Sequence, residues 1–233
     1  RSTLFPYTTL FRSLADQDGA GGGRARDAPS VEVAVAQYGD GEAVRAALTG
    51  VDVLLMVSAS ESADRLLQHR TFIDAAAAAG VRHVVYTSFL GAAADAVFTL
   101  ARTHWATEEH LRASGMGFTL LRDSFYLDFL PDLAVDGVIA GPAGTGRVGA
   151  VAREDVARAA AAVLADLAAG DKRHDGAVYE LTGPRALSLS DVAAILTAAG
   201  RPTVYRQESV EEAYASRRSE EHTSELQSLG RIS

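Results

Sequence analysis

Residues 51–57 read VDVLLMV, a run that is apolar at almost every position. A strand with apolar side chains on both faces is typical of the buried centre of a parallel sheet. Gly50 ends the helical segment before this run, and a polar loop, SASES, follows it at residues 58–62. The stretch therefore predicts an α/β fold, and the neighbouring elements are assigned outward from it.

Short β-branched runs alternate along the chain with Ala-rich segments, which is the pattern of βαβ units around a mostly parallel sheet. The predicted strands are residues 31–36, 51–57, 84–87 and 118–121, and the predicted helices are residues 41–48, 63–79, 103–114, 153–169 and 189–199. Ser188 is expected to cap the last helix, with Asp191 near its positive end. The pattern predicts a Rossmann-like, doubly wound parallel sheet.

Composition excludes several classes of function. The chain has 233 residues, a net charge of −8 and no cysteine. An excess of carboxylates disfavours nucleic-acid binding. No apolar run reaches the roughly 18 residues of a membrane span. Without cysteine there is no disulfide, no thiolate metal ligand and no cysteine nucleophile, and no metal site is predicted. No signal peptide is visible, so a cytoplasmic location is expected.

The two ends of the chain differ from its interior. Residues 3–13, TLFPYTTLFRS, and 218–228, RSEEHTSELQS, resemble translations of the adapter oligonucleotides used in short-read sequencing. Neither residues 1–13 nor residues 218–233 contain an Ala or a Val, although both are common in between. We therefore interpret residues 1–13 and 218–233 as adapter-derived and residues 14–217 as one partial domain.

Polar side chains follow three of the predicted strands. In an open parallel sheet, ligands bind at the carboxyl ends of the strands. This rule selects Ser58 and Ser60, then Thr87 and Ser88, and finally residues 122–126. A single Ser or Thr at a strand end is more often a turn or cap residue. Three such loops in one register favour a binding site.

Three segments carry a more specific resemblance: VDVLLMVSASES (51–62), QHRTFIDAAAAAGVRHVVYTSFL (68–90) and HWATEEHLRASGMGFTLLRDSFYLDF (104–129). In this order they resemble the NmrA-like branch of the atypical short-chain dehydrogenases, most closely the bacterial NADPH-dependent quinone oxidoreductases. The similarity covers most of residues 31–206. It implies NADP as the cofactor, with NAD as the alternative.

The resemblance also implies roles for individual residues. Ser58 and Ser60 would flank the dinucleotide, and Thr87 and Ser88 would lie beside the nicotinamide ribose. Arg122 would lie near the nicotinamide ring. Substrate contacts are expected from Phe89, Phe125 and Tyr126. The chain departs from the family's Leu-Arg-Asn-Gly-Trp-Tyr segment at Asp123, Ser124 and Phe125, so the resemblance does not carry over the identity of the substrate.

The proton donor of ordinary short-chain dehydrogenases, the tyrosine of a Tyr-x-x-x-Lys motif, is absent. None of the seven tyrosines is followed by Lys four places on. His104 stands where that Lys would fall, and it is the tentative catalytic residue, either bonding a ribose hydroxyl or relaying a proton. The alternative is a partly exposed helical histidine paired with Glu108. Quinone reduction relaxes the need for an acid, because solvent can protonate a phenolate-like product.

Two further features have alternative interpretations. Gln68, His69 and Arg70 form a polar triplet, which we interpret as a solvated helix face in preference to a cofactor contact. Trp105, the only tryptophan, is interpreted as core packing or as a contact in a homodimer, in preference to a wall of the ring pocket.

The resemblance also implies two segments of the family that this chain does not match. The family's first strand and its Gly-x-x-Gly-x-x-Gly turn should precede the aligned region, where this chain has its adapter-like segment. The GAGGG cluster at 19–23 has no strand before it or helix after it, so residues 16–30 are interpreted as a linker. Arg24 and Arg26 are candidates for a 2′-phosphate contact. We expect an N-terminally truncated fold, a small C-terminal substrate lobe cut short after Glu208–Tyr214, and weak NADPH binding.

The residues and the resemblance together predict a fragment of an NAD(P)H-dependent oxidoreductase. Its parent would reduce quinones or similar electron-poor carbonyls by hydride transfer to a small-molecule substrate. The alternative is a non-catalytic NAD(P)-binding redox sensor of the NmrA type. The two differ in one observation, because only the enzyme oxidises NADPH when a quinone is present.

Overall fold

The computed structural model describes residues 8–13 and 31–215, and these residues form two compact units. Within the described ranges, unit 1 comprises residues 8–13, 31–123 and 157–180, and unit 2 comprises residues 124–156 and 181–215. Both units are therefore built from segments that are separated in the sequence.

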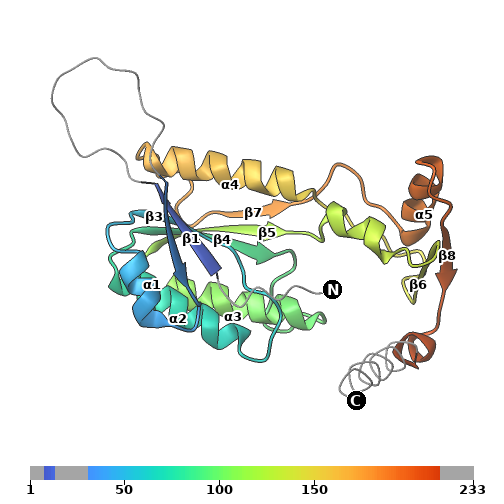
Figure 1. Ribbon diagram of the computed structural model, residues 1–233, viewed down its shortest axis with the longest axis horizontal. Helices are drawn as coiled ribbons and strands as arrows, with labels where there is room; N and C mark the ends of the chain where they lie inside the picture. Colours follow the sequence, from blue (N-terminus) through green and yellow to red (C-terminus); the bar gives the residue numbers. More distant parts are fainter. Residues whose placement is uncertain (1–7, 14–30, 216–233) are drawn as a thin grey trace, which may run out of the picture. The chain divides into compact units, whose positions relative to one another are not determined.

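A four-stranded sheet lies at the centre of unit 1 (Figure 1). Its strands, in spatial order, are β3 (Val53–Met56), β4 (His83–Phe89), β5 (Gly117–Asp123) and β7 (Val178–Leu181). β3 pairs with β4, and β4 pairs with β5, in the parallel sense. β4 is buried along almost its whole length, as expected of a central parallel strand. The parallel α/β sheet predicted from the sequence is confirmed.

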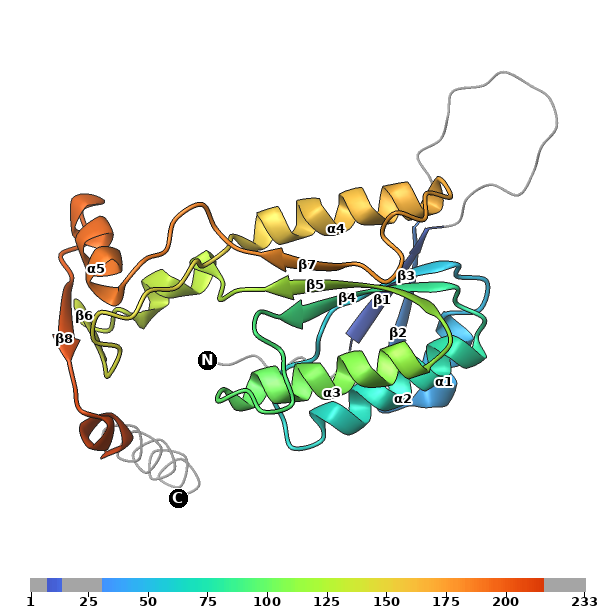
Figure 2. The ribbon, with the colours of Figure 1, turned by 180° about the vertical axis from the view of Figure 1, so that it is seen from behind.

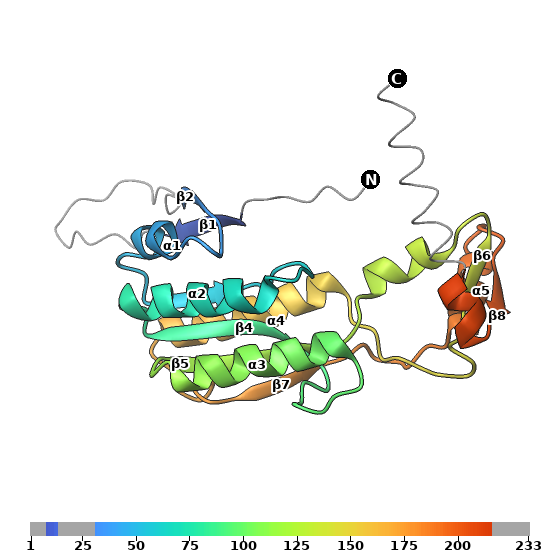
Figure 3. The ribbon, with the colours of Figure 1, turned by 90° about the horizontal axis from the view of Figure 1, so that it is seen from below.

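Helices cover both faces of this sheet. α1 (Gly41–Ala47), α2 (Arg65–Ala78) and α3 (Thr99–Ala113) lie on one face, and α4 (Arg153–Ala168) lies on the other (Figures 1 and 2). Figure 3 shows α2 and α3 running side by side over β4. The largest fully buried side chains of this core are Tyr86, Phe72, Met56, Ile73, Leu111 and Leu120. The doubly wound arrangement is thus confirmed as well.

A second, two-stranded sheet belongs to the N-terminal part of unit 1. β2 (Val31–Ala36) is a strand, as predicted, but it pairs antiparallel with β1 (Thr8–Ser13) and not with the parallel sheet. β1 lies in the adapter-like segment, for which the sequence predicts no element. Among the described strands, β3 therefore stands at one end of the four-stranded sheet.

Unit 2 has its own small core. Its elements are a 3₁₀ helix, η1 (Leu127–Leu133), the strands β6 (Val138–Gly141) and β8 (Val204–Gln207), and the helix α5 (Leu189–Ala198). β6 and β8 pair in parallel, and the sequence analysis had predicted neither. The buried apolar residues are Leu130, Ala134, Ile139, Ala150, Leu187, Val192 and Ala193.

The predicted cap of the last helix is confirmed. The Ser188 hydroxyl accepts a hydrogen bond from the Asp191 N–H at 3.1 Å, and the Asp191 carboxylate accepts one from the Ser188 N–H at 2.9 Å. This reciprocal pair satisfies two donors at the helix start. Across the part of the chain that the structure describes, every helix is too short or too polar to cross a membrane.

Candidate functional site

Two of the three predicted polar loops are joined directly. The backbone N–H of Ser58, after β3, donates to the Oγ1 of Thr87, near the end of β4, at 2.9 Å. Thr87 and Ser88 are buried, Ser58 is half-buried and Ser60 is exposed. This bond joins the loop after β3 to the end of β4, and Ser60 is the most accessible of the four residues. Their contact with a dinucleotide stays a prediction.

A single buried carboxylate on α3 organises the ends of β4 and β5. Glu108 is 0% exposed and accepts from the Ser88 hydroxyl at 2.5 Å. Arg122, which lies beside Ser88 in the strand register, donates to both Glu108 oxygens, from Nε at 2.9 Å and from Nη2 at 2.6 Å. Arg112 adds a longer contact of 3.2 Å. The hydrogen bonds to Glu108 raise the pKa of the Arg122 guanidinium, so its positive charge is secured.

His104 is buried in this layer and bonds to other residues than the ones predicted. Its Nε2 lies 2.9 Å from Arg65 Nη2, and its Nδ1 lies 2.9 Å from the Tyr86 hydroxyl. The interpretation of a partly exposed histidine paired with Glu108 is wrong, because His104 is 3% exposed and Glu108 is engaged by Ser88 and two arginines. The ribose contact stays a prediction.

His69 corrects another expectation. The triplet that contains it was interpreted as a solvated face, but His69 is 0% exposed, while Arg70 is exposed. His69 Nε2 accepts from the Ala59 N–H at 2.9 Å, and Nδ1 lies 3.0 Å from the Thr107 hydroxyl. α2 therefore buries His69, one of the three polar residues, against the loop after β3.

Both histidines are held in the neutral form. Burial, reinforced by the charge of Arg65, lowers the pKa of His69 to about 3 and that of His104 to about 3. Burial also raises the pKa values of Tyr38 and Tyr86 above their ordinary range. None of these four groups changes its protonation near neutral pH, so the arrangement supports a fixed hydrogen-bond network and not a proton relay through His104.

Aromatic rings accompany this network in unit 1. The ring of Phe89, a predicted substrate contact, lies 5.9 Å from the ring of His104 in a stacked arrangement and 5.5 Å from that of Phe98. Trp105 is half-buried, and the Arg112 guanidinium lies 5.5 Å from its ring centre. This cation–π contact gives Trp105 a packing role on the surface of α3.

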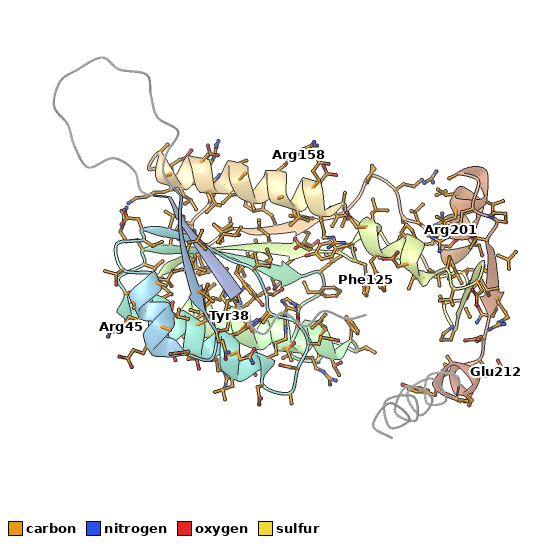
Figure 4. The ribbon with its side chains drawn as sticks, in the orientation of Figure 1. Tyr38, Arg45, Phe125, Arg158, Arg201 and Glu212 are labelled. Atoms are coloured by element: carbon orange, nitrogen blue, oxygen red, sulfur yellow. The ribbon has the colours of Figure 1, made fainter. Side chains whose placement is uncertain are left out.

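The other two predicted substrate contacts belong to unit 2. The Phe125 carbonyl accepts from the Val151 N–H at 2.9 Å, and the Phe125 side chain, labelled in Figure 4, is 43% exposed. The Arg153 guanidinium lies 5.9 Å from the Tyr126 ring. A role for either ring in binding substrate stays a prediction.

Unit 2 also has a hollow of about 300 Å³. It is lined by Leu133, Ile139, Ala140, Gly141, Pro142, Ala143 and Leu189. None of these side chains titrates or donates a hydrogen bond, so we assign no chemistry to the hollow.

Some predicted features fall outside the described residues, namely the GAGGG cluster at 19–23, Arg24 and Arg26. Among the residues that are described, no cluster of three or more His, Asp or Glu side chains could hold a metal ion.

The sequence analysis missed Arg65, which is 3% exposed and connects α2 to the loop after β3. Helical spacing was the available signal. Arg65 and His69 are four residues apart, and they continue the stripe formed by Phe72, Ile73 and Ala76, all of which are buried. A polar pair on an apolar stripe indicates a buried network, since such groups must find partners inside the protein.

Comparison with known proteins agrees with this fold. A family model described as NAD(P)H-binding matches residues 16–167. Quinone oxidoreductase 2 of Escherichia coli is 42% identical over 188 residues, which are 78% of this chain and 64% of that protein. The resemblance found in the three sequence segments is thereby confirmed.

Solved structures give the same result. The NADPH-dependent quinone oxidoreductase of E. coli complexed with NADPH matches with a TM-score of 0.65 at 40% identity, covering 75% of this chain and 61% of that one. The Citrobacter triphenylmethane reductase complexed with NADP(H) matches with a TM-score of 0.67 at 31% identity, covering 76% of this chain and 63% of that one. The chain thus spans less than two thirds of the length of each of these proteins.

Proposed function

The chain belongs to the NAD(P)H-binding family, and from this premise we propose that it binds NADPH and transfers a hydride from it to a quinone or a similar electron-poor carbonyl compound. The observation that carries the proposal is the hydrogen bond from the Ser58 N–H to Thr87, which joins the carboxyl ends of β3 and β4, with the exposed Ser60 following in the same loop. NADH is the alternative cofactor.

The donor set at this edge fits a dinucleotide. Ribose and phosphate oxygens are bound by hydroxyl and backbone N–H groups. Ser60 is exposed, Ser58 is half-buried, and the Thr87 hydroxyl, which accepts from the Ser58 N–H, keeps its own proton to donate. We assign direct binding to these three residues.

Ser88, Arg122 and His104 have a supporting role in this proposal. Ser88 and Arg122 are tied to Glu108, and both ring nitrogens of His104 are engaged by Arg65 and Tyr86. These residues hold the ends of β4 and β5 against α3 and would support the residues that bind the cofactor.

When bound, NADPH supplies a hydride. Reduction of a quinone to a hydroquinone needs that hydride and one proton, and solvent provides the proton because the product is phenolate-like. The residues of the chain therefore have to position the two reactants and need not supply an acid. This agrees with the missing Tyr-x-x-x-Lys motif and with the neutral His104.

The test is to mix the full chain with NADPH and 1,4-benzoquinone, follow the loss of NADPH absorbance and measure hydroquinone by chromatography. Reactions without protein correct for the direct reaction of the two compounds. We expect protein-dependent turnover that is faster with NADPH than with NADH. Binding of NADPH without turnover would favour the redox sensor, and no binding of either dinucleotide would reject both functions.

We also propose that the protein acts on a small-molecule substrate in the cytoplasm and forms a homodimer. Size-exclusion chromatography with light scattering tests the dimer, for which a mass of one chain would be the contradicting result.

A further inference from the structure

The loop after β3 is held by side chains from three parts of unit 1. The Val57 carbonyl accepts from the Tyr38 hydroxyl at 2.6 Å, and the Ser58 N–H donates to Thr87. The Ala59 N–H donates to His69 Nε2 at 2.9 Å, and the Ala59 carbonyl accepts from Arg65 Nε at 2.7 Å. The backbone of residues 57–59 is therefore fixed by side chains, where a loop would ordinarily be solvated.

The two α2 residues that hold Ala59 are themselves fixed by α3. His69 Nε2 accepts from a backbone N–H, so the ring proton is on Nδ1, which donates to Thr107. Thr107 donates in turn to the Thr103 carbonyl. Arg65 donates to the Thr103 hydroxyl at 2.9 Å and to His104 Nε2. Each of these bonds pairs a donor with an acceptor, so the two histidine rings and the Arg65 side chain hold one another in place.

Burying an arginine and two histidines is costly, and an apolar stripe would stabilise the contact between α2 and α3 at least as well. The polar groups converge on Ala59, one residue from the exposed Ser60. This placement suits control of the loop backbone better than it suits helix packing.

We propose that His69 and Arg65 are positioning residues of the dinucleotide site, which fix the backbone of residues 57–59 in the conformation that receives the cofactor. This role rests on the proposed function. Tyr38, which lies after β2 and is labelled in Figure 4, has the same role, because its hydroxyl holds the Val57 carbonyl of this loop.

The experiment compares His69→Leu, which removes the acceptor for the Ala59 N–H, with His69→Gln, which retains one at the position of Nε2. His110→Gln is the matched control. His110 also joins α3 to α2, through Asp74 at 2.7 Å, but it does not contact the loop. Amide exchange at Ser58 and Ala59 is measured by NMR without cofactor, and the Kd for NADPH is measured by nicotinamide fluorescence on samples whose circular dichroism shows them to be folded.

We expect His69→Leu to speed exchange at Ala59 and to raise the Kd about tenfold, the effect of one lost hydrogen bond. His69→Gln should stay within about threefold of the wild type, and His110→Gln should not change the Kd. The proposal is overturned if a folded His69→Leu variant has a loosened loop and an unchanged Kd. It is equally overturned if His110→Gln weakens binding as much.

Tyr38→Phe provides a second variant, because it removes one hydroxyl and no packing. Loss of its bond to Val57 should raise the Kd about threefold, and an unchanged Kd would contradict the proposal even if His69→Leu fails to fold. A wild-type chain that binds no NADPH would overturn the proposed function together with this inference. Failure of the proposed function is distinguishable from failure of the positioning role, because NADPH binding is measured on the wild type before any variant is compared.

Discussion

His69 and His104 are neutral because of what surrounds them. Each ring is buried, and each uses Nε2 to accept a hydrogen bond, from Ala59 in one case and from Arg65 in the other. Protonation would remove that acceptor and would place a second positive charge beside Arg65. The stability of unit 1 should therefore depend on pH through these two residues.

The pH dependence has a definite sign. The folded pKa of each ring is about 3, below the ordinary value of 6.5, so the unfolded chain takes up protons that the folded chain cannot. This contribution to stability is fully present above pH 6.5 and is lost progressively as the pH falls toward 3. Between pH 7 and pH 5 the free energy of unfolding should fall by about 2 kcal/mol for each histidine.

Urea denaturation at the two pH values measures this loss. His69→Gln should lower the difference between pH 7 and pH 5 by about 2 kcal/mol, since glutamine does not titrate. His110→Gln, a change of a more exposed histidine on α3, serves as the control. An unchanged pH dependence in His69→Gln would show that His69 is not buried in the neutral form.

Glu108 is the second residue whose environment predicts a large effect. In Glu108→Gln the carboxylate that neutralises Arg122 and Arg112 is lost, and Arg122 is left only 15% exposed. Removing one partner of a buried ion pair leaves an uncompensated charge, so the free energy of unfolding should fall by about 3 kcal/mol. Glu109→Gln is the matched control on the same helix, because Glu109 is 52% exposed and pairs with Arg112 at the surface. Equal stabilities of the two variants in urea denaturation would contradict this prediction.

At the scale of elements, the sequence predicted the strands, helices and cap that are determined by a local pattern of residues. The apolar run at 51–57, the Ala-rich helices and the Ser188 cap each carry their signal within a few residues, and all are present. β6 and β8 were missed because each has four residues and they pair across a separation of more than 60 positions. The strand at 31–36 was found, but its partner was not, since pairing depends on which strand is available.

The residues of the candidate site also fall into those that the sequence could predict and those that depend on packing. The strand-end rule located Ser58, Thr87 and Ser88, because chain direction in a parallel sheet fixes where loops gather. It did not locate Glu108 or Arg65, whose roles come from the packing of α2 and α3 against each other and against the sheet. His69 was misplaced because its neighbours in sequence are polar, while its neighbours on the helix face are apolar.

Among the described glycines of unit 2, Gly183 has the least room for a side chain. A Cβ at this position would lie 2.0 Å from the Ala150 carbonyl oxygen, and the Gly183 N–H donates to the Gly149 carbonyl at 3.0 Å. Gly183→Ala must therefore separate two backbone segments, and we expect a loss of about 2 kcal/mol in the free energy of unfolding.

Gly141→Ala is the matched control for this prediction. It lies in the same unit and has no atom within 4 Å of an added Cβ. Thermal unfolding followed by far-ultraviolet circular dichroism compares the two variants. A Gly183→Ala protein as stable as Gly141→Ala would mean that the two segments can separate without cost.

At the scale of the whole molecule, ligand binding is linked to stability. If NADPH binds only the folded chain, a concentration of 100 times the Kd raises the free energy of unfolding by about 2.7 kcal/mol. We expect this increase with NADPH and a smaller one with NADH at the same concentration. Urea denaturation with and without the dinucleotide measures it, and an unchanged midpoint at saturating NADPH would contradict folded-state binding.

The lone Trp105 gives the molecule an unusual optical property. It is the only tryptophan among 233 residues, and it lies on α3 under the Arg112 guanidinium, on the helix that carries His104 and Glu108. All tryptophan emission therefore originates in unit 1, while circular dichroism records the helices of both units. Emission therefore follows the melting of unit 1 alone, and dichroism recorded on the same sample follows both units, without any introduced label. The same indole is a ready energy donor to a reduced nicotinamide, so quenching of its emission would report an occupied site directly.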